Sequence, residues 1–483
     1  MNQCINSCGL VLIFLMNGFF VSAQAKEQFS LENRVAAVES HLCSSVLDQN
    51  NPEFWSLQQR MEYYKSIGLS ITVISNYQID WTKAYGFSNK EKLQLVDSIT
   101  LFQAGSISKS LNAIALLKLV QDGKIDLHSD INQYLTSWKF PYDSLSKGKK
   151  ITIAHLLSHS AGLNVHGFYG YSQGKSIPTT LEILKGAKPA NSEPIHSIFE
   201  PGLKFQYSGG GITISQMIVE DVTGLSYEDY LWKAVLEPLG MIKSSFSQPP
   251  NSFVQTKLSS GYFPNGKMVK GNYHLYPEKA AAGLWSTTAE LAKYVLETQQ
   301  ALEGRSEKVL NQQNTNLRLT PYITSSVGLG VFIHEENGER YFEHSGADVG
   351  FMSKYVATFE GGNGVVVMTN GMQAEILDEI IRSVAVVYNW KVLQPEQKKV
   401  IQLSELQRKN LVGKYKMDRT IIKIKEKDGE LLLITPNAEK WKLFFSDQFS
   451  FFVKENPIQF EVQYSESMEV KGLKINGQMA VKM

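Results

Sequence analysis

Runs of apolar residues at the two ends of the first four hundred positions predict the strands of a sheet. Residues 69–81 predict a hairpin with its turn at Asn76 and Tyr77, and a further strand follows at 84–87. After residue 325 the apolar runs return and predict four more strands and a closing helix, at 328–334, 341–345, 350–359, 364–369 and 375–390.

From Ser106 the apolar positions change to the spacing of a helix, at Leu111, Ile114, Ala115, Leu117, Leu119 and Val120. Asp122-Gly123 ends this helix, and its apolar faces predict that it is largely buried. The stretch 127–319 mixes loops with short helices, at 153–157, 211–222 and 286–296, the last with a capping box at Thr287 and Glu290. Strands on both sides of the helices predict an α+β fold, an antiparallel sheet flanked by helices with an all-helical insert.

A different pattern begins after the polar segment 395–403. Short apolar runs at nearly regular spacing predict strands at 421–425, 430–434, 441–445, 449–453, 459–464 and 469–475. Such a series is typical of a small all-β domain with a barrel-like sheet. Since no titratable cluster occurs there, we expect an accessory or packing role.

Length and composition agree with two folded units. A chain of 483 residues exceeds the usual size of one domain, and 43% hydrophobic with 20% charged residues is typical of a globular protein. The predicted domains cover 30–395 and 404–483. A formal net charge of +1, without a local Lys and Arg run, argues against nucleic acid as a partner.

The first 25 residues differ from the rest. They carry no charged side chain, hold apolar stretches at 10–16 and 19–21, and end in Ala23-Gln24-Ala25. This predicts a secretory signal over 1–25, cut after Ala25, and a periplasmic or secreted protein without a stable membrane span. The segment also lacks Lys and Arg, so an uncleaved segment that tethers the protein to a membrane is the alternative.

The three cysteines indicate neither a disulfide nor a catalytic thiol. Cys4 and Cys8 lie in the predicted signal, which leaves Cys43 alone and excludes an internal disulfide. Cys43 stands in an ordinary amphipathic stretch and is predicted to be a buried structural thiol.

The segment 102–109 carries the clearest chemical pattern. Gly105 permits a tight turn, and Ser106 opens the long helix with Lys109 one turn further on the same face. A serine hydroxyl needs a neighbouring base, and a lysine that burial keeps partly uncharged can serve as one. The amide N–H groups of a helix N-terminus also favour the oxyanion of a tetrahedral intermediate. The pattern therefore predicts a nucleophile beside its base.

Two later motifs support the interpretation of Ser106 and Lys109 as a catalytic pair. Tyr207 stands on the glycine-rich stretch 205–211, and His344 precedes Gly346 and Ala347 on a predicted strand. Ser-x-x-Lys, a tyrosine motif and His-x-Gly in this order resemble the class C β-lactamase and penicillin-binding protein family of serine hydrolases. The segments 153–163 and 281–286 also resemble that family, so the resemblance spans about 70–390.

The resemblance implies a β-lactamase/DD-peptidase-like fold and a covalent mechanism without a cofactor. It implies that Ser106 is acylated and that Lys109 and Tyr207 relay its proton. It also implies that the N–H groups of Ser106 and Ala347 form the oxyanion hole, with Gly209, His344 and Gly346 among the substrate-binding positions.

Two departures from the family pattern affect specificity. Gly209 stands where the family usually has asparagine, which removes an amide that would bind substrate. His344 stands where β-lactamases usually have lysine, and histidine is a weaker cation at pH 7. His-x-Gly is similar to the motif of D-amino-acid peptidases, amidases and esterases, so these activities are favoured over an efficient β-lactamase.

Structural interpretations compete with the chemical ones. Ser106 could cap a helix beside a solvated Lys109, Tyr207 could be a buried aromatic residue, and His344 could bond within the sheet. His155 and His159 have the spacing of zinc ligands on a helix, but Leu156 stands where a metalloprotease has its glutamate, so we expect a structural role and no metal. Asp348 could orient substrate or cap a loop.

The sequence therefore predicts an exported serine hydrolase that cleaves an amide or ester through an acyl-enzyme on Ser106. It would act as a D-amino-acid peptidase, a DD-carboxypeptidase-like enzyme or an esterase, on small molecules or cell-wall peptides. A penicillin-binding sensor or non-catalytic binding protein with a degenerate site is the alternative, followed by a β-lactamase. The loops around 167–174 and 261–275 that would shape the pocket carry no decodable signature, so the substrate stays open, as does the oligomeric state.

Overall fold

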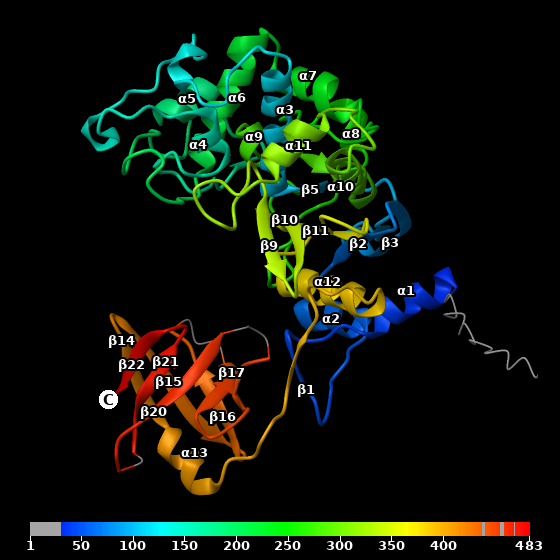
Figure 1. Cartoon of the computed structure of the whole chain (residues 1–483). Helices are drawn as coiled ribbons and strands as arrows, with labels where there is room; N and C mark the ends of the chain where they lie inside the picture. Colours follow the sequence, from blue (N-terminus) through cyan, green and yellow to red (C-terminus); the bar gives the residue numbers. More distant parts are fainter. Residues whose placement is uncertain (1–29, 437–439, 455–457, 468) are drawn as a thin grey trace, which may run out of the picture.

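The computed structural model describes residues 30–436, 440–454, 458–467 and 469–483 (Figure 1), and the predicted signal at 1–25 lies outside them. A seven-stranded antiparallel sheet forms its centre, in the order β4-β3-β2-β12-β11-β10-β9. These strands are β2 (Gly68–Ser75), β3 (Gln78–Asn89), β4 (Gln94–Leu95), β9 (Phe332–Glu336), β10 (Glu339–Asp348), β11 (Phe351–Thr358) and β12 (Gly364–Thr369).

Strands from both ends of this region meet in the middle of the sheet, as predicted. β12 pairs antiparallel with β2, with Val366 opposite Thr72. The predicted strand at 84–87 is the continuation of β3, which runs past a register shift between Val73 and Ile74 of its partner. Thr82 and Lys83, which lie between the two predicted strands, pair regularly with Thr72 and Ile71, so one continuous strand replaces the two that were predicted.

Helices cover both faces of the sheet (Figure 1). Along β12, Val365 and Val367 pack with α1 (Leu31–Ser40), α2 (Leu57–Tyr64) and α12 (Glu375–Val387). Val366 and Met368 pack on the opposite face with α3 (Ser108–Gln121) and α10 (Thr288–Leu302). Burial on both faces explains why the central strands are continuous apolar runs.

The insert is largely helical. Its helices are α4 (Ile153–Leu157), α5 (Thr180–Lys185), α6 (Gly209–Thr223), α7 (Tyr227–Leu231), α8 (Ser252–Gln255), α9 (Lys279–Ala282) and α11 (Gln312–Arg318). Short antiparallel pairs join them: β5 (Phe102–Gln103) with β8 (Trp285–Ser286) and β6 (Tyr171–Ser172) with β7 (His274–Leu275). Two-residue strands are too short to leave a periodic pattern.

Half of the predicted capping box at α10 forms. The Thr287 hydroxyl accepts from the backbone N–H of Glu290 at 3.1 Å. The Glu290 carboxylate instead accepts from the backbone N–H of Lys243 and the hydroxyl of Ser244. The Glu290 carboxylate thus bonds to a distant segment, at Lys243 and Ser244, instead of to the backbone N–H of Thr287.

The C-terminal residues form a nine-stranded sheet, in the order β17-β16-β15-β14-β22-β21-β20-β19-β18. Its strands are β14 (Gly413–Met417), β15 (Thr420–Lys427), β16 (Glu430–Ile434), β17 (Lys440–Lys442), β18 (Phe444–Phe445), β19 (Ser450–Phe452), β20 (Gln459–Tyr464), β21 (Val470–Ile475) and β22 (Gln478–Lys482). The outermost strands β17 and β18 are separated only by Leu443, so the sheet curls until its ends meet, and we call it the barrel. α13 (Glu405–Leu411) precedes it and was not predicted.

Contacts near the N-terminus hold the barrel to the rest of the chain. β1 (Val46–Asp48) pairs in parallel with β13 (Glu396–Lys398), in the segment that leads to the barrel. The Lys454 ammonium pairs with Glu53 at 3.0 Å, and the Ser45 hydroxyl donates to the carbonyl of Lys454. Over the described part of the chain, no helix has both the length and the apolar character that crossing a membrane requires.

Candidate active site

A cavity of about 610 Å³ opens between the sheet and the insert, and the predicted catalytic and binding residues line it with one exception. The lining residues are Ser106, Lys109, Tyr207, His344, Gly346 and Ala347. Gly209 is buried at the start of α6 and is not among the lining residues. The fold therefore gathers three motifs that lie about a hundred residues apart in the sequence.

Ser106 stands on a tight turn at the start of the buried helix. It lies in a 3-10 turn, Gly105–Ile107, that continues directly into α3. Gly105 has φ +50°, and a Cβ there would meet the backbone nitrogen of Ala347 at 2.6 Å. Only glycine permits this close approach, which brings the turn against the backbone of β10. Between residues 101 and 117, Ser106 is the one residue that is not buried.

Lys109 holds the Ser106 hydroxyl from one turn along the helix. Its Nζ lies 2.9 Å from Ser106 Oγ and donates to the carbonyl of Ala281 at 2.8 Å. The side chain is almost fully buried, and Nζ lies 5.0 Å from the centroid of the Tyr207 ring. The side-chain nitrogen of Lys109 is therefore fixed between the Ser106 hydroxyl and the Tyr207 ring.

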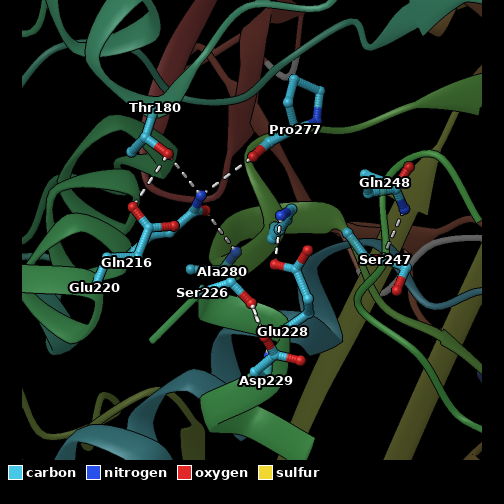
Figure 2. A network of polar contacts seen from close by, with 12 residues as sticks. Thr180, Gln216, Glu220, Ser226, Glu228, Asp229, Ser247, Gln248, Pro277 and Ala280 are labelled. Atoms are coloured by element: carbon cyan, nitrogen blue, oxygen red, sulfur yellow. Dashed lines mark hydrogen bonds and ion pairs between the residues drawn. The ribbon is translucent and has the colours of Figure 1, made fainter. Parts of the chain in front are cut away.

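The short helix α9, which contains Ala281, is held by a polar network that Figure 2 shows. The buried Gln216 of α6 accepts from the backbone N–H of Ala280 at 3.1 Å and donates to the carbonyl of Pro277 at 3.3 Å. Lys279 pairs with Glu228 of α7. This network fixes α9, and α9 fixes the carbonyl that receives Lys109.

Tyr207 lies directly before α6, among aromatic rings. Ring centroids lie at 4.2 Å for His159, 4.9 Å for His166 and 6.5 Å for Phe332. Gly209 donates its N–H to the carbonyl of His166 at 3.0 Å. A Cβ on Gly209 would meet the Phe168 ring at 3.0 Å, so the position that usually holds asparagine is filled by an aromatic wall.

β10 brings the third motif to the same place. His344, Gly346 and Asp348 share one face of the strand, because alternate residues of a strand point the same way. A Cβ on Gly346 would lie 1.9 Å from the carbonyl of Ala104, which no side chain permits. Gly346 thus lets the strand lie against the turn that carries Ser106.

His344 presents a neutral ring to the cavity. Its Nδ1 lies 2.7 Å from the carbonyl of Ser345, and a carbonyl only accepts, so Nδ1 carries the hydrogen. Burial, then the positive charge of Lys109, lowers the pKa of His344 to about 4. At neutral pH its Nε2 is therefore a hydrogen-bond acceptor, where the related lysine would be a cation.

Asp348 also borders the cavity. Burial raises its pKa well above the usual range, although the positive charge of Lys109 opposes this. Neither carboxyl oxygen has a hydrogen-bond partner among the described residues. No loop cap of the kind considered from the sequence is formed by this side chain in the described structure.

The remaining sequence candidates have structural surroundings. His155 Nδ1 accepts from the backbone N–H of Thr152, and His159 Nδ1 accepts from that of Ser208. In the part of the chain that the structure describes, no three His, Cys, Asp or Glu side chains are placed to hold a metal ion. Cys43 is buried, as predicted, and burial raises the pKa of its thiol to about 11.

Sequence reasoning did not identify the aromatic surroundings of Tyr207. His159 and His166 lie in the loop after α4, and Phe332 lies on β9, far away in the sequence, so no local pattern could bring the three together. His159 stands in the stretch 153–163, which resembles the family, but its contact with Tyr207 depends on a turn that spacing does not predict.

A second cavity, of about 980 Å³, lies between α2 and β3. Its two serines already have structural partners, because Ser56 caps α2 and Ser66 bonds to Thr369 at 3.0 Å. The smaller cavity is the one that contains a serine hydroxyl bonded to a buried amine, which is the arrangement that nucleophilic catalysis requires.

The sequence model of the Beta-lactamase family matches residues 56–388. Protein flp of Staphylococcus aureus (strain MRSA252) is 24% identical over 318 residues, which are 65% of this chain and 61% of that protein. The match thus spans less than two thirds of that relative's length.

Solved structures share the fold. The octameric penicillin-binding protein homologue from Pyrococcus abyssi has a TM-score of 0.62 at 22% identity, over 88% of this chain and 98% of that one. The structure of SurE with D-Leu has a TM-score of 0.54 at 16% identity, over 88% of this chain and 97% of that one. These likenesses confirm an α+β fold of the predicted kind.

Proposed function

Because this chain belongs to the beta-lactamase family, we propose that it is a serine hydrolase that cleaves an amide or ester bond through an acyl-enzyme on Ser106. The observation that supports this most directly is the 2.9 Å hydrogen bond between Lys109 Nζ and Ser106 Oγ, inside a cavity that also holds Tyr207. The same nitrogen also donates to the carbonyl of Ala281, which holds the lysine in a fixed position against the hydroxyl.

The geometry supports a two-step reaction. Ser106 Oγ attacks the carbonyl carbon and passes its proton to the Lys109 and Tyr207 pair, while the N–H groups of Ser106 and Ala347 receive the oxyanion. The pair then returns the proton to the leaving nitrogen or oxygen, which breaks the scissile bond. A water molecule repeats the sequence on the acyl-enzyme and releases the acid.

The lining of the cavity favours particular substrates. His344 offers an uncharged acceptor, which suits an N–H, hydroxyl or ammonium group better than a carboxylate. Phe168, Phe205 and Phe332 supply apolar walls. Together with the likeness to SurE, which is known with D-Leu, these features favour amides, peptides or esters of apolar D-amino acids over a DD-carboxypeptidase substrate.

A penicillin-binding sensor is the second candidate, because one observation favours it. Gly209 brings no amide to the cavity, and Phe168 occupies the space beside it. A site that acylates but positions the deacylating water poorly would accumulate the covalent adduct. We further propose export across the membrane, on the character of residues 1–25.

Labelling and turnover measured together test the proposal. We expect a fluorophosphonate to add one adduct at Ser106, and a panel of p-nitrophenyl esters and D-aminoacyl anilides to contain a hydrolysed member. Ser106→Ala should lose both, and Ser137→Ala, an exposed serine bonded to Asp221, should keep both. Hydrolysis that survives Ser106→Ala would contradict the proposal, and a lasting penicillin adduct without any turnover would favour the sensor.

A further inference from the structure

His159 occupies an unusual place in the turn that follows α4. It is almost fully buried, at 3% exposure, and its backbone is left-handed, with φ +54°. That region is disfavoured for residues with a side chain and is adopted more often by asparagine, aspartate and histidine than by others. A strained conformation of this kind persists when the surrounding contacts require it.

Three contacts connect this residue to Tyr207. The His159 carbonyl accepts from the backbone N–H of Gln206 at 2.7 Å, and its Nδ1 accepts from that of Ser208 at 3.2 Å. The His159 ring lies with its centroid 4.2 Å from the Tyr207 ring centroid, at an angle of 31°. One residue therefore holds the backbone on both sides of the tyrosine and one face of its ring.

The protonation state of His159 agrees with this arrangement. Because Nδ1 accepts an N–H, the hydrogen of the neutral ring stands on Nε2. Burial, and after it the positive charge of Lys109, lowers the pKa of His159 well below its usual range. Nε2 has no hydrogen-bond partner in the described structure, so no described side chain offers it a route for passing on a proton.

We infer that His159 is a positioning residue that holds Tyr207 in register with Lys109 and Ser106, and does not itself exchange protons with substrate. The inference rests on the proposed function, because it assigns His159 to the service of a catalytic Tyr207. A displacement of about 1 Å in a catalytic group can cost about a hundredfold in rate, so a residue that fixes the tyrosine in this way has a measurable kinetic effect.

Substitutions separate the contributions of His159. His159→Asn keeps an acceptor near the position of Nδ1 and tolerates the left-handed backbone, but loses the ring. His159→Ala loses both side-chain contacts. We expect kcat to fall about thirtyfold in His159→Ala, with KM changed less than about twofold, and to recover in large part in His159→Asn.

His155 provides the matched control. It lies four residues earlier, and its Nδ1 also accepts a backbone N–H, that of Thr152, but no ring contact joins it to Tyr207. His155→Ala should lower thermal stability as His159→Ala does, and leave kcat within about twofold of wild type. Equal losses of kcat in the two variants would overturn the inference, because they would show a general effect of destabilisation.

A double-mutant cycle with Tyr207→Phe gives the decisive measurement. The readout is the rate of fluorophosphonate labelling at Ser106, which can be followed even when turnover is too slow. If His159 acts through the Tyr207 hydroxyl, His159→Ala should slow labelling of the wild type and leave the Tyr207→Phe protein unchanged. The same slowing in both backgrounds would overturn the inference.

The cycle also distinguishes failure of the inference from failure of the proposed function. If Tyr207→Phe labels at the wild-type rate, Tyr207 has no catalytic hydroxyl role and His159 cannot serve it, although a Ser106 hydrolase remains. If Ser106→Ala keeps its hydrolytic activity, the proposed function itself is wrong. Should His159→Ala fail to fold, His159→Asn carries the same test with a smaller expected effect.

Discussion

The seven-stranded sheet and the barrel are both antiparallel, but they bury their residues differently. All six residues of β12 are buried, because helices cover both faces of that sheet. In the barrel, β15 alternates between exposed and buried positions, with a single inner face. The first arrangement has room between its layers for a site, whereas the second encloses one apolar core.

Buried polar groups follow the same division. Lys109, Glu278, Arg318 and Asp348 are all buried in the region of the seven-stranded sheet. Among the described residues of 404–483, Lys454 is the one polar side chain that is buried. Burial of a charge is costly unless a partner compensates it, and burial raises the pKa of Glu278 and Asp348, so these two carboxyl groups favour their neutral forms.

The two buried lysines allow a direct comparison. We expect Lys109→Ala to reduce kcat by about 10³-fold, because the amine bonded to the Ser106 hydroxyl is removed. Lys454→Ala removes the pair with Glu53, which holds the barrel to the preceding segment. It should lower the free energy of unfolding by about 1 kcal/mol and leave kcat unchanged. Steady-state kinetics and urea unfolding on both variants measure the two effects.

A comparable fall of kcat in the two variants would break the distinction between the regions. It would show that the position of the barrel, and not the local chemistry of Lys109, limits turnover. If Lys109→Ala kept the kcat of the wild type, only the catalytic role of Lys109 would be refuted.

The strands of both sheets were predictable where the apolar run is long. β12 was predicted with its observed bounds, because burial on both faces leaves an unbroken run of apolar residues. β14, by contrast, was missed, since its sequence Gly-Lys-Tyr-Lys-Met contains one fully buried residue, Tyr415. α13 was missed because it is short and polar, and its capping box at Ser404 and Gln407 is its main signal.

The site shows the same limit of local patterns. Ser106 and Lys109 were predictable as neighbours because one helical turn joins them. Tyr207 and His344 were assigned to the same site only through a family resemblance, because their meeting depends on the packing of α6 and β10 against the Ser106 turn. Neither helical spacing nor the family resemblance predicted the contact of His159 with Tyr207, since a left-handed turn creates it.

Acid provides a second way to test the comparison, because all nine histidines precede residue 345 and the barrel contains none. The pKa of His344 is lowered to about 4 in the folded protein, mainly by burial. The folded protein holds His344 in its neutral form. The contribution of this residue to stability is therefore complete above the unfolded pKa of about 6.5 and is lost as the pH falls toward 4. The loss from His344 amounts to about 3 kcal/mol.

The variant His344→Asn isolates this contribution. Urea unfolding at about pH 7 and pH 4 should show that wild type loses about 3 kcal/mol more than the variant over this interval. Glu278, whose pKa is raised to about 8 by burial, titrates in both proteins and cancels from the difference. The exposed His196→Asn serves as control and should behave as wild type. An equal loss in wild type and His344→Asn would contradict the buried neutral state of His344.

The smallest expected effect comes from adding the same amide to one glycine in each region. At Gly209 a Cβ would meet the Phe168 ring at 3.0 Å and the His166 carbonyl at 3.2 Å, whereas at Gly429 of the β15–β16 turn nothing lies within 4 Å. Gly429 has φ +79°, which asparagine tolerates better than most residues. Gly209→Asn therefore requires the Phe168 ring or the His166 carbonyl to shift by a few tenths of an ångström, and Gly429→Asn requires no shift.

We expect Gly209→Asn to lower kcat/KM about fivefold on the best substrate of the panel, because Phe168 lines the cavity and the family amide cannot enter without moving it. Gly429→Asn should leave kcat/KM unchanged and lower the free energy of unfolding by less than about 1 kcal/mol. If Gly209→Asn instead raised penicillin acylation without loss of hydrolysis, the cavity would be able to accept the amide. The aromatic wall would then be an adjustable feature of the site, and the preference for apolar substrates inferred from it would be wrong.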